Sequence, residues 1–449
     1  MLTDPGVSAD SSATLRRASL AATVGSAIEY YEFTAYGFLA VVFAPLFFPT
    51  DNPAAATLSA LAIFGGGYLA RPLGGVVFGA LGDRLGRKPV LLVTIFLMGF
   101  ASMAIGLIPT YAQIGLIAPL LLLLLRVLQG LSAGGEFTGA QTYIVEMAPP
   151  KKRGVYGSLP ALGICIGFAS GALMVGAVTL FTTPEQMTSW GWRIPFLVCI
   201  PLTVVCLLIR RHLEEAPGFQ EISEREETAK NPVRDVLRSH FPAVLKVIGL
   251  AIAILGPAFL GKLYMAIFLV QERGLDKATV YFTLGGLLAL SACAYPVMGS
   301  LSDRIGRRPL VLAGCAAYLV MSLPLFLVTT STSSLWAVAP VLLCFVLIEA
   351  AMSGAVYTTI AELFPEKVRY TGTSVGFNIG AIIAAGFGPY ISAQLVAATG
   401  SQISPAFWGI GCALLGIIVY FTLAETSEST KDPVLAPEET SVTRVDASA

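Results

Sequence analysis

Ionisable side chains that interrupt long apolar runs are the residues of this sequence best placed to do chemistry, because a charge is costly away from water. Glu29 and Glu32 lie three positions apart in one apolar run, where a helix would put them on one face with Tyr36. In a later run, Arg126 and Gln129 have the same spacing. A carboxylate that faces a guanidinium can bind and release a proton when its surroundings change. The pattern predicts a proton switch formed by Glu32, Glu29 and Arg126; a purely structural ion pair is the alternative.

Further polar residues in apolar runs are candidates for contact with a small polar ligand. Lys262 is a natural counter-ion for a ligand carboxylate. Pairing with Glu349, or extension of the lysine toward the membrane surface, explains it equally well. Arg71 stands among glycines, and backbone carbonyls or an acid such as Glu136 could satisfy it instead of a ligand. We predict that the ligand is contacted by Arg126, Gln129, Tyr36, Lys262, Tyr264, Glu349, Asn378 and Arg71.

The elements that must hold these residues are membrane-spanning helices. Hydrophobic residues make up 55% of the 449 positions, charged residues only 12%, and the mean hydropathy is +0.76. A helix of about 20 apolar residues crosses a bilayer. The sequence predicts twelve such spans, at roughly 19–46, 55–80, 90–108, 116–144, 156–181, 192–211, 244–270, 278–299, 310–329, 335–361, 371–398 and 405–423.

Two short motifs each occur twice, about half the chain apart. The first is Gly79-Ala-Leu-Gly-Asp83-Arg84-Leu-Gly86-Arg87, which recurs 220 positions later as Gly299-Ser-Leu-Ser-Asp303-Arg304-Ile-Gly306-Arg307. The second pairs Glu146 with Arg153 and recurs 216 positions later as Glu362 with Arg369. Matching motifs at these offsets predict an all-α integral membrane protein built from two related six-helix bundles.

The distribution of positive charge sets the predicted orientation. About 22 of the 28 Lys and Arg residues fall on one side of the predicted spans, and cytoplasmic loops carry such an excess. We therefore expect a multi-pass protein of the cell membrane with both termini in the cytoplasm. The expected N-terminal tail covers residues 1–18, of which 1–15 lack regular structure. The two bundles are expected at 19–212 and 243–424, with a cytoplasmic linker at 213–242 between them and a disordered tail at 425–449.

Both copies of the first motif resemble the G-x-L-x-D-R-x-G-R-[KR] signature of the major facilitator superfamily. Other segments are similar to its metabolite:proton symporter branch, whose members carry shikimate, 2-oxoglutarate, citrate, proline and betaine. These segments are Glu29-Tyr-Tyr-Glu32-Phe, Ala70-Arg71-Pro72, Arg126-Val-Leu-Gln129-Gly130, Gly191-Trp192-Arg193 and Leu213-Glu214-Glu215-Ala-Pro217. The branch commonly has Trp or Phe and then Asp where this chain has Tyr31 and Glu32. The long coiled-coil tail of some proline/betaine carriers is absent.

The resemblance implies the twelve-helix major facilitator fold and a gate at its cytoplasmic side. There, carboxylates would cap neighbouring helix N-termini and arginines would pair with Glu146 or Glu362. The implied gating residues are Gly79, Asp83, Arg84, Gly86, Arg87, Glu146, Arg153, Asp303, Arg304, Gly306, Arg307, Glu362 and Arg369. A role in topology alone is the alternative.

These observations together predict a proton-coupled symporter that imports a small carboxylate or zwitterion by alternating access. An efflux or uniport carrier of a small organic compound is the alternative. We expect a monomer whose partners are the substrate, protons and the lipid bilayer, and no nucleic acid because the net charge is zero. No G-x-x-x-x-G-K-[ST] loop occurs and the two histidines, His212 and His240, lie in the linker region. We therefore expect no cofactor, no metal and no enzymatic activity.

Overall fold

The computed structural model describes residues 9–85, 87–211, 232–365, 368–423 and 425. We call residues 79–87 and 299–307, the two copies of the first repeated motif, the first and second hinge motifs. Most of the predicted linker, the C-terminal tail beyond residue 425 and Gly86 of the first hinge motif lie outside the described residues. The same holds for the side chains from 82 to 88 and for residues 79 and 80, so the structure places only the backbone of Asp83, Arg84 and Arg87.

The regular structure of the described residues is all helical. Within these residues, eleven helical segments are long and apolar enough to cross a membrane, and a shorter apolar helix of 17 residues occupies the place of the predicted twelfth span. In the N-terminal half the helices are α1 (Ala9–Phe47), α2 (Pro53–Leu69), α3 (Arg71–Leu85), α4 (Arg87–Leu107), α5 (Tyr111–Ile114), α6 (Ile117–Met147), α7 (Arg153–Gly157), α8 (Leu159–Phe181), α9 (Pro184–Ser189), α10 (Ile194–Leu197) and α11 (Cys199–Arg210).

The C-terminal half repeats this order of long helices. Its helices are α13 (Pro232–Ser239), α14 (Phe241–Phe259), α15 (Met265–Gln271), α16 (Lys277–Ala292), α17 (Ala294–Ile305), α18 (Arg307–Ser331), α19 (Leu335–Glu362), α20 (Arg369–Ala381), α21 (Gly388–Thr399) and α22 (Pro405–Phe421). A π-helical turn at Leu260–Tyr264 joins α14 to α15, and a second at Ile382–Gly386 joins α20 to α21. Single π turns inside long helices often mark functional positions.

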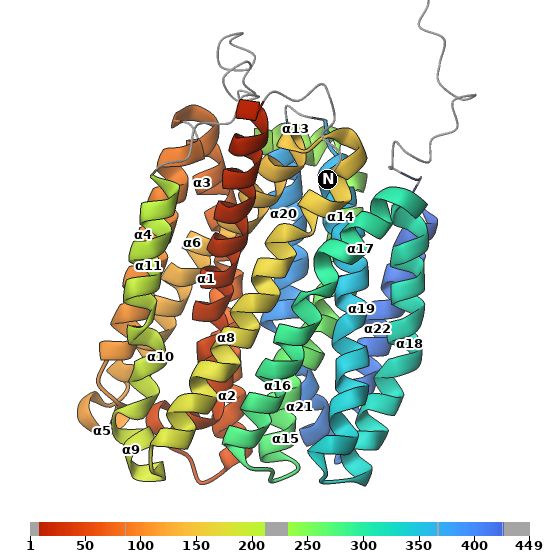
Figure 1. The fold of residues 1–449 in the computed structure, drawn as a ribbon. Helices are drawn as coiled ribbons and strands as arrows, with labels where there is room; N and C mark the ends of the chain where they lie inside the picture. The colour runs from red at the N-terminus through yellow and green to blue at the C-terminus, as the bar shows by residue number, and fades with distance from the viewer. Residues whose placement is uncertain (1–8, 86, 212–231, 366–367, 424, 426–449) are drawn as a thin grey trace, which may run out of the picture.

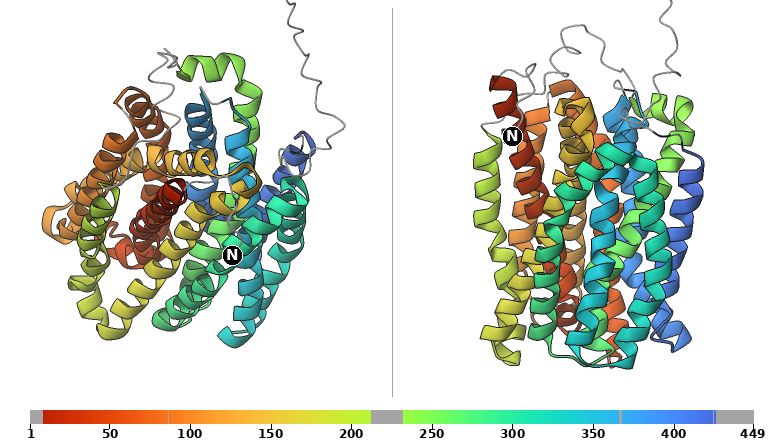
Figure 2. Two further views of the ribbon diagram at one scale, coloured as in Figure 1. Left: turned by 45° about the horizontal axis from the view of Figure 1, so that its top comes forward. Right: turned by 45° about the vertical axis from the view of Figure 1, so that its right-hand side comes forward.

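The helices run side by side along one common axis, with the N-terminal half beside the C-terminal half (Figure 1). The two halves meet where α8 packs along both α1 and α16, and where α20 packs against α3 and α6. Figure 2 shows the same two groups from two further directions. The described ends of the chain, Ala9 and Glu425, lie at the same end of the bundle, which we call the terminal end.

Helices extend into two segments that the sequence predicts to lie outside the bundles. The helix α1 begins at Ala9, so part of the predicted unstructured stretch 1–15 is helical. The physical reason is that Pro5 and Gly6 precede this point, whereas no proline or glycine follows before Gly25 to interrupt the helix. At the other site, the predicted linker ends in the short helix α13, which packs against α14 and α20.

Glycines allow α6 to pack closely against both α2 and α3. A Cβ atom on Gly130 would lie 1.6 Å from the backbone oxygen of Gly67, and one on Gly134 would lie 1.9 Å from that of Arg71. Small residues allow helix backbones in a membrane to approach this closely. The contact therefore determines where Arg71 on α3 and Arg126 on α6 point.

Candidate functional site

The side chain of Arg126 is fully buried in the first half of α6, and it is the centre of the candidate site. Its Nη1 atom donates a hydrogen bond of 2.8 Å to Oε1 of Gln129. Three aromatic rings surround the guanidinium, with centroids 4.7 Å away for Phe33, 4.4 Å for Tyr36 and 5.1 Å for Phe64. Among the described residues, no carboxylate pairs with Arg126, and its Nε and Nη2 atoms have no hydrogen-bond partner.

The carboxylate of Glu32 does not contact Arg126 directly, so the predicted face-to-face pair is wrong in this structure. Instead, the hydroxyl of Ser102 on α4 donates to Glu32, and Nε2 of Gln129 donates to Ser102 over 2.5 Å. Glu32 and Arg126 are therefore connected by hydrogen bonds through the side chains of Ser102 and Gln129. Sequence reasoning missed Ser102, although it is one of only two hydroxyl side chains in the apolar stretch from 90 to 107.

Arg71 and Glu29 form a buried ion pair, with 2.9 Å between Nη2 and Oε1. The rings of Phe33 and Tyr68 cover the guanidinium of Arg71 at 4.5 and 4.4 Å. The partner of Arg71 is thus an acid of α1, and not Glu136, which was the acid suggested by the sequence. Glu32, in contrast, is a buried acid on α1 that accepts a hydrogen bond from a neutral side chain.

In the C-terminal half, Lys262 pairs with Glu349, as one of the predicted alternatives requires. Its Nζ atom also donates to the hydroxyl of Tyr295 at 3.2 Å and lies 5.2 Å from the ring centroid of Phe168 in the other half. Lys262 belongs to the π turn that follows Pro257, so the turn places this charge at the boundary between the halves.

Three other residues predicted to contact the ligand make contacts inside the protein. The amide nitrogen of Asn378 donates to the backbone oxygen of Gly134 in the other half at 2.7 Å and to that of Ser374 at 2.9 Å. Tyr264 is buried beside Phe268. Tyr36 contributes its ring to the surroundings of Arg126, while its hydroxyl donates to the backbone oxygen of Ala60 at 3.0 Å.

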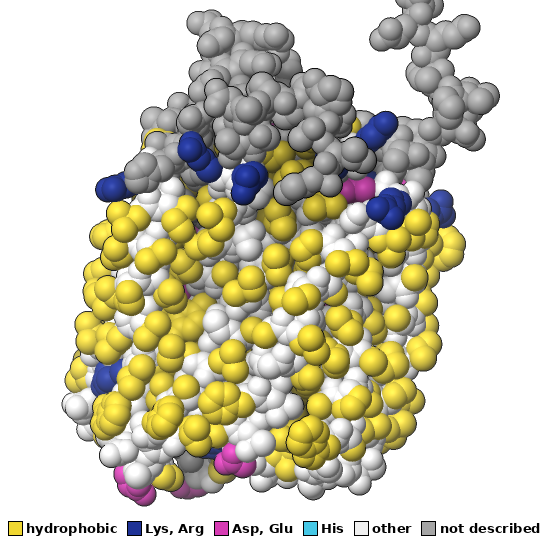
Figure 3. Space-filling view, viewed as in Figure 1, with side chains coloured by type: hydrophobic (Ala, Val, Ile, Leu, Met, Phe, Trp, Pro, Cys, Tyr) yellow, Lys and Arg dark blue, Asp and Glu magenta, His cyan; other side chains and the backbone are white. Residues whose placement is uncertain are grey.

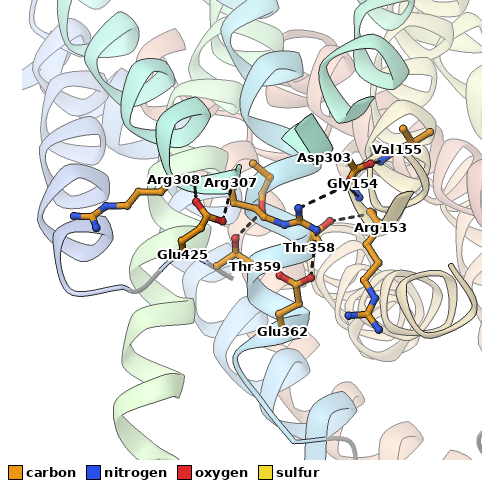
Figure 4. A network of polar contacts seen from close by, with 11 residues as sticks. Arg153, Gly154, Val155, Asp303, Arg307, Arg308, Thr358, Thr359, Glu362 and Glu425 are labelled. Atoms are coloured by element: carbon orange, nitrogen blue, oxygen red, sulfur yellow. Dashed lines mark hydrogen bonds and ion pairs between the residues drawn. The ribbon is translucent and has the colours of Figure 1, made fainter. Parts of the chain in front are cut away.

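Residues of the second hinge motif connect the two halves at the terminal end (Figure 4). The carboxylate of Asp303 accepts hydrogen bonds from the backbone nitrogens of Gly154 at 2.7 Å and Val155 at 3.0 Å, at the start of α7. Arg307 lies 3.6 Å from Asp303 and 3.3 Å from Glu362. These contacts have the helix-capping and ion-pairing form that the sequence suggested for this motif.

Other predicted gating residues lie around this network. Arg369 is 3.5 Å from Glu146 across the halves. The backbone oxygen of Arg153 accepts from the hydroxyl of Thr358 at 3.3 Å. Gly306 has a φ of +96°, a backbone conformation that favours glycine, in the turn between α17 and α18. Arg304 is exposed.

The two halves are also in contact at the opposite end of the bundle, where no gating residue was predicted from the sequence. The hydroxyl of Tyr281 on α16 donates to the backbone oxygen of Phe38 on α1 at 2.7 Å. The side-chain amide of Gln271 on α15 donates to the hydroxyl of Thr57 on α2, also at 2.7 Å. Arg126 and Lys262 therefore lie between two sets of contacts that join the halves. In the described part of the chain, no group of three or more His, Cys, Asp or Glu could hold a metal ion.

Comparison with known proteins gives consistent matches over most of the chain. Residues 25–382 match the family model described as Major Facilitator Superfamily. The chain is 36% identical over 428 residues to a proline/betaine transporter of Salmonella typhimurium, covering 92% of this chain and 84% of that protein. It is 36% identical over 385 residues to a shikimate transporter of Escherichia coli, covering 85% and 88%. Its fold is similar to that of the xylose transporter XylE from E. coli, with a TM-score of 0.72, 16% identity and coverage of 92% and 99%.

Proposed function

Because the chain belongs to the major facilitator superfamily, as a multi-pass membrane transport protein and not an enzyme, we propose that it imports a small carboxylate or zwitterion together with protons. The predicted alternating-access mechanism suits a site that lies between contacts at both ends of the bundle. Opening one set of contacts while the other stays closed would expose the site to one side of the membrane at a time.

The observation that carries the proposal is the buried guanidinium of Arg126. A buried charge without an ionic partner is costly, because neither water nor a carboxylate offsets its desolvation. A substrate carboxylate that binds at Nε and Nη2 would supply the missing partner through two parallel hydrogen bonds. The solutes named for the relatives above, proline, betaine and shikimate, each contain a carboxylate, which agrees with this role for Arg126.

The rings around Arg126 favour a zwitterion within this class. Phe33, Tyr36 and Phe64 face one cation already, and aromatic faces also attract quaternary ammonium groups. A bound zwitterion would place its carboxylate on Arg126 and its cationic end against a neighbouring ring. Tyr68, whose hydroxyl has no hydrogen-bond partner among the described residues, is a ring near this position.

We assign proton binding to Glu32. Glu29 is the weaker candidate, because its ion pair with Arg71 favours the ionised form of that carboxyl. Glu32 is equally buried, but its bonded partner is the neutral hydroxyl of Ser102. Neutralisation of Glu32 by a proton therefore removes a buried charge without stranding an oppositely charged partner.

The proposed orientation places the terminal end in the cytoplasm. Figure 3 shows most of the visible Lys and Arg side chains near that end, whereas Asp and Glu side chains are visible at both ends. Exposed Lys151 and Lys152 lie between α6 and α7 at the terminal end. This asymmetry follows the rule that cytoplasmic loops are rich in Lys and Arg. The contacts of Asp303 then form a cytoplasmic gate, and those of Tyr281 form an outer gate. We propose that the transporter works as a monomer.

Uptake by purified protein in liposomes tests this function, with proline, glycine betaine and shikimate as labelled solutes. We expect accumulation against a gradient when the outside is more acidic. Glu32→Gln should abolish the accumulation while exchange of labelled for unlabelled solute continues, because exchange needs no net proton release. The exposed Glu185→Gln is the matched control and should behave as the unaltered protein.

Other results would select a different function. Equilibration without accumulation in the unaltered protein would identify a uniporter, and solute expulsion would identify an efflux carrier. If Glu32→Gln still accumulates solute in response to a pH gradient, Glu32 is not the proton site, and Glu29 becomes the candidate.

A further inference from the structure

We propose that Ser102 is a positioning residue that couples proton binding at Glu32 to substrate binding at Arg126. The inference rests on the proposed function, since it needs a proton at the first residue and a substrate carboxylate at the second. It adds a physical connection between the two, made by Ser102 and Gln129, that neither the motifs nor the comparisons indicate.

The hydrogen bonds between these residues all point in one direction. Arginine can only donate, so the oxygen of the Gln129 amide must face Arg126, as the 2.8 Å bond shows. The amide nitrogen of Gln129 must then face Ser102, and it too can only donate. The hydroxyl of Ser102 accepts that bond and is left with its own hydrogen to donate to Glu32. Donation therefore runs from Arg126 through Gln129 and Ser102 to Glu32 without a reversal.

The chain of bonds is shielded from water. Arg126, Gln129 and Ser102 have no exposed surface, and Glu32 is only 1% exposed. Hydrogen bonds that are linked in series in a medium of low polarity strengthen one another. A change in the charge of Glu32 therefore alters the strength of the hydrogen bond to Arg126, although the two side chains are not in contact.

The direction of the series gives the coupling a definite sign. When Glu32 is ionised, the bond from Ser102 is charge-assisted, so Ser102 and Gln129 are held in place and Gln129 retains Nη1 of Arg126. A proton on Glu32 removes that assistance and weakens the bond between Gln129 and Nη1, so the guanidinium can turn to align its Nε and Nη2 atoms with a substrate carboxylate. By linkage, substrate binding on Arg126 must favour the protonated form of Glu32 to the same degree. Proton and substrate thus bind cooperatively, as symport requires.

Other groups also face Glu32, and one of them, Cys199, interacts with Ser102 as well. They are Glu29 and Tyr31 on α1, Glu136 on α6, and Cys199 and Thr203 on α11. None of them connects Glu32 to Arg126 through hydrogen bonds given by the described structure. An experiment that changes Ser102 alone therefore separates the connection from the general surroundings of the proton site.

The first test measures the affinity of purified protein for glycine betaine, proline and shikimate between pH 5 and pH 8. Coupling between two sites changes affinity by about five- to 150-fold, so the unaltered protein should bind more tightly at low pH within that range. Ser102→Ala should make affinity nearly independent of pH, and Ser102→Thr, which keeps the hydroxyl, should restore the dependence. The control is Ser322→Ala, because Ser322 is equally buried and bonds only to the backbone oxygen of Tyr318 on its own helix.

The outcomes distinguish failure of this inference from failure of the proposed function. If Glu32→Gln abolishes the pH dependence and Ser102→Ala keeps all of it, the coupling role of Ser102 is refuted while the proton site stands. If Glu32→Gln keeps the pH dependence, the proton site itself is wrong and the coupling falls with it.

A second test needs no substrate. Infrared difference spectra between low and high pH contain the carboxyl band of protonated Glu32, which Glu32→Gln identifies by its loss. Gln129→Met should shift this band when Ser102 is present, because it breaks the series one bond away. It should leave the band unmoved when Ser102 is alanine. The proposal would be overturned if Gln129→Met alone left the position of the Glu32 carboxyl band unchanged.

Discussion

The proposed cytoplasmic gate can be tested by replacing Asp303 with asparagine. Asparagine keeps one acceptor oxygen, so the change removes one of the two backbone bonds to α7 and the charge that strengthens the other. A hydrogen bond to a charged group contributes about 1.5–3 kcal/mol. Since about 1.4 kcal/mol corresponds to a tenfold change in an equilibrium constant, Asp303→Asn should shift the equilibrium toward the state open to the cytoplasm by roughly 10- to 150-fold.

The distance between spin labels on the two halves measures this shift. Arg17 on α1 and Arg238 on α13 are exposed near the terminal end in different halves, so cysteines there can carry the labels in a transport-competent background without the native cysteines. Asp303→Asn should increase the population with the longer distance. Asp276→Asn is the matched control, because Asp276 also caps a helix, accepting from the backbone of Thr279 at 2.8 Å, but lies at the opposite end within one half. If Asp303→Asn leaves the distances as Asp276→Asn does, the contact is not a gate.

Three further changes test the ion pair, the helix packing and the outer gate. Lys262→Met should lower the free energy of unfolding by about 3–5 kcal/mol, because it leaves the buried carboxylate of Glu349 without its cation; addition of Glu349→Gln should recover most of this loss in thermal denaturation in detergent, with the exposed Lys277→Met as control. Gly130→Ala should prevent the close contact of α2 and α6 and sharply reduce the yield of folded protein in size-exclusion chromatography. Tyr281→Phe should remove one bond between the halves, worth about 0.5–1.5 kcal/mol, and increase the population open at the outer end in spin-label distances measured there.

Each of these expectations has a result that would contradict it. A Lys262→Met protein as stable as Lys277→Met would mean that the pair is unimportant for folding. Continued loss of substrate affinity in a stable double variant would instead give Lys262 a role in binding. Normal folding of Gly130→Ala would show that the helices can separate without cost, and unchanged outer distances in Tyr281→Phe would remove this bond from the outer gate.

The sequence singled out polar residues that the structure buries close together, but it did not predict the contacts between them. Glu32, Arg126 and Gln129 were identified because polar residues in apolar runs are conspicuous. The contacts between them could not be predicted, because serine is common in membrane helices and nothing in the neighbouring sequence distinguishes Ser102. Asn378 shows the converse case: its position in a span suggested a ligand contact, whereas the structure uses it to join the halves.

The sequence alone determined the fold class, the approximate positions of the apolar helices and the duplication of the hinge motif in the two halves. These properties follow from local patterns, namely the length of apolar runs, the positions of Lys and Arg, and the repeat of Asp83 as Asp303. The tertiary structure decided which charges pair. Arg71 meets Glu29, Lys262 meets Glu349, and Arg126 meets no carboxylate among the described residues. The rotation of each helix about its axis sets these partners, and that rotation depends on contacts between distant segments, such as the glycines of α2 and α6, which no local pattern records.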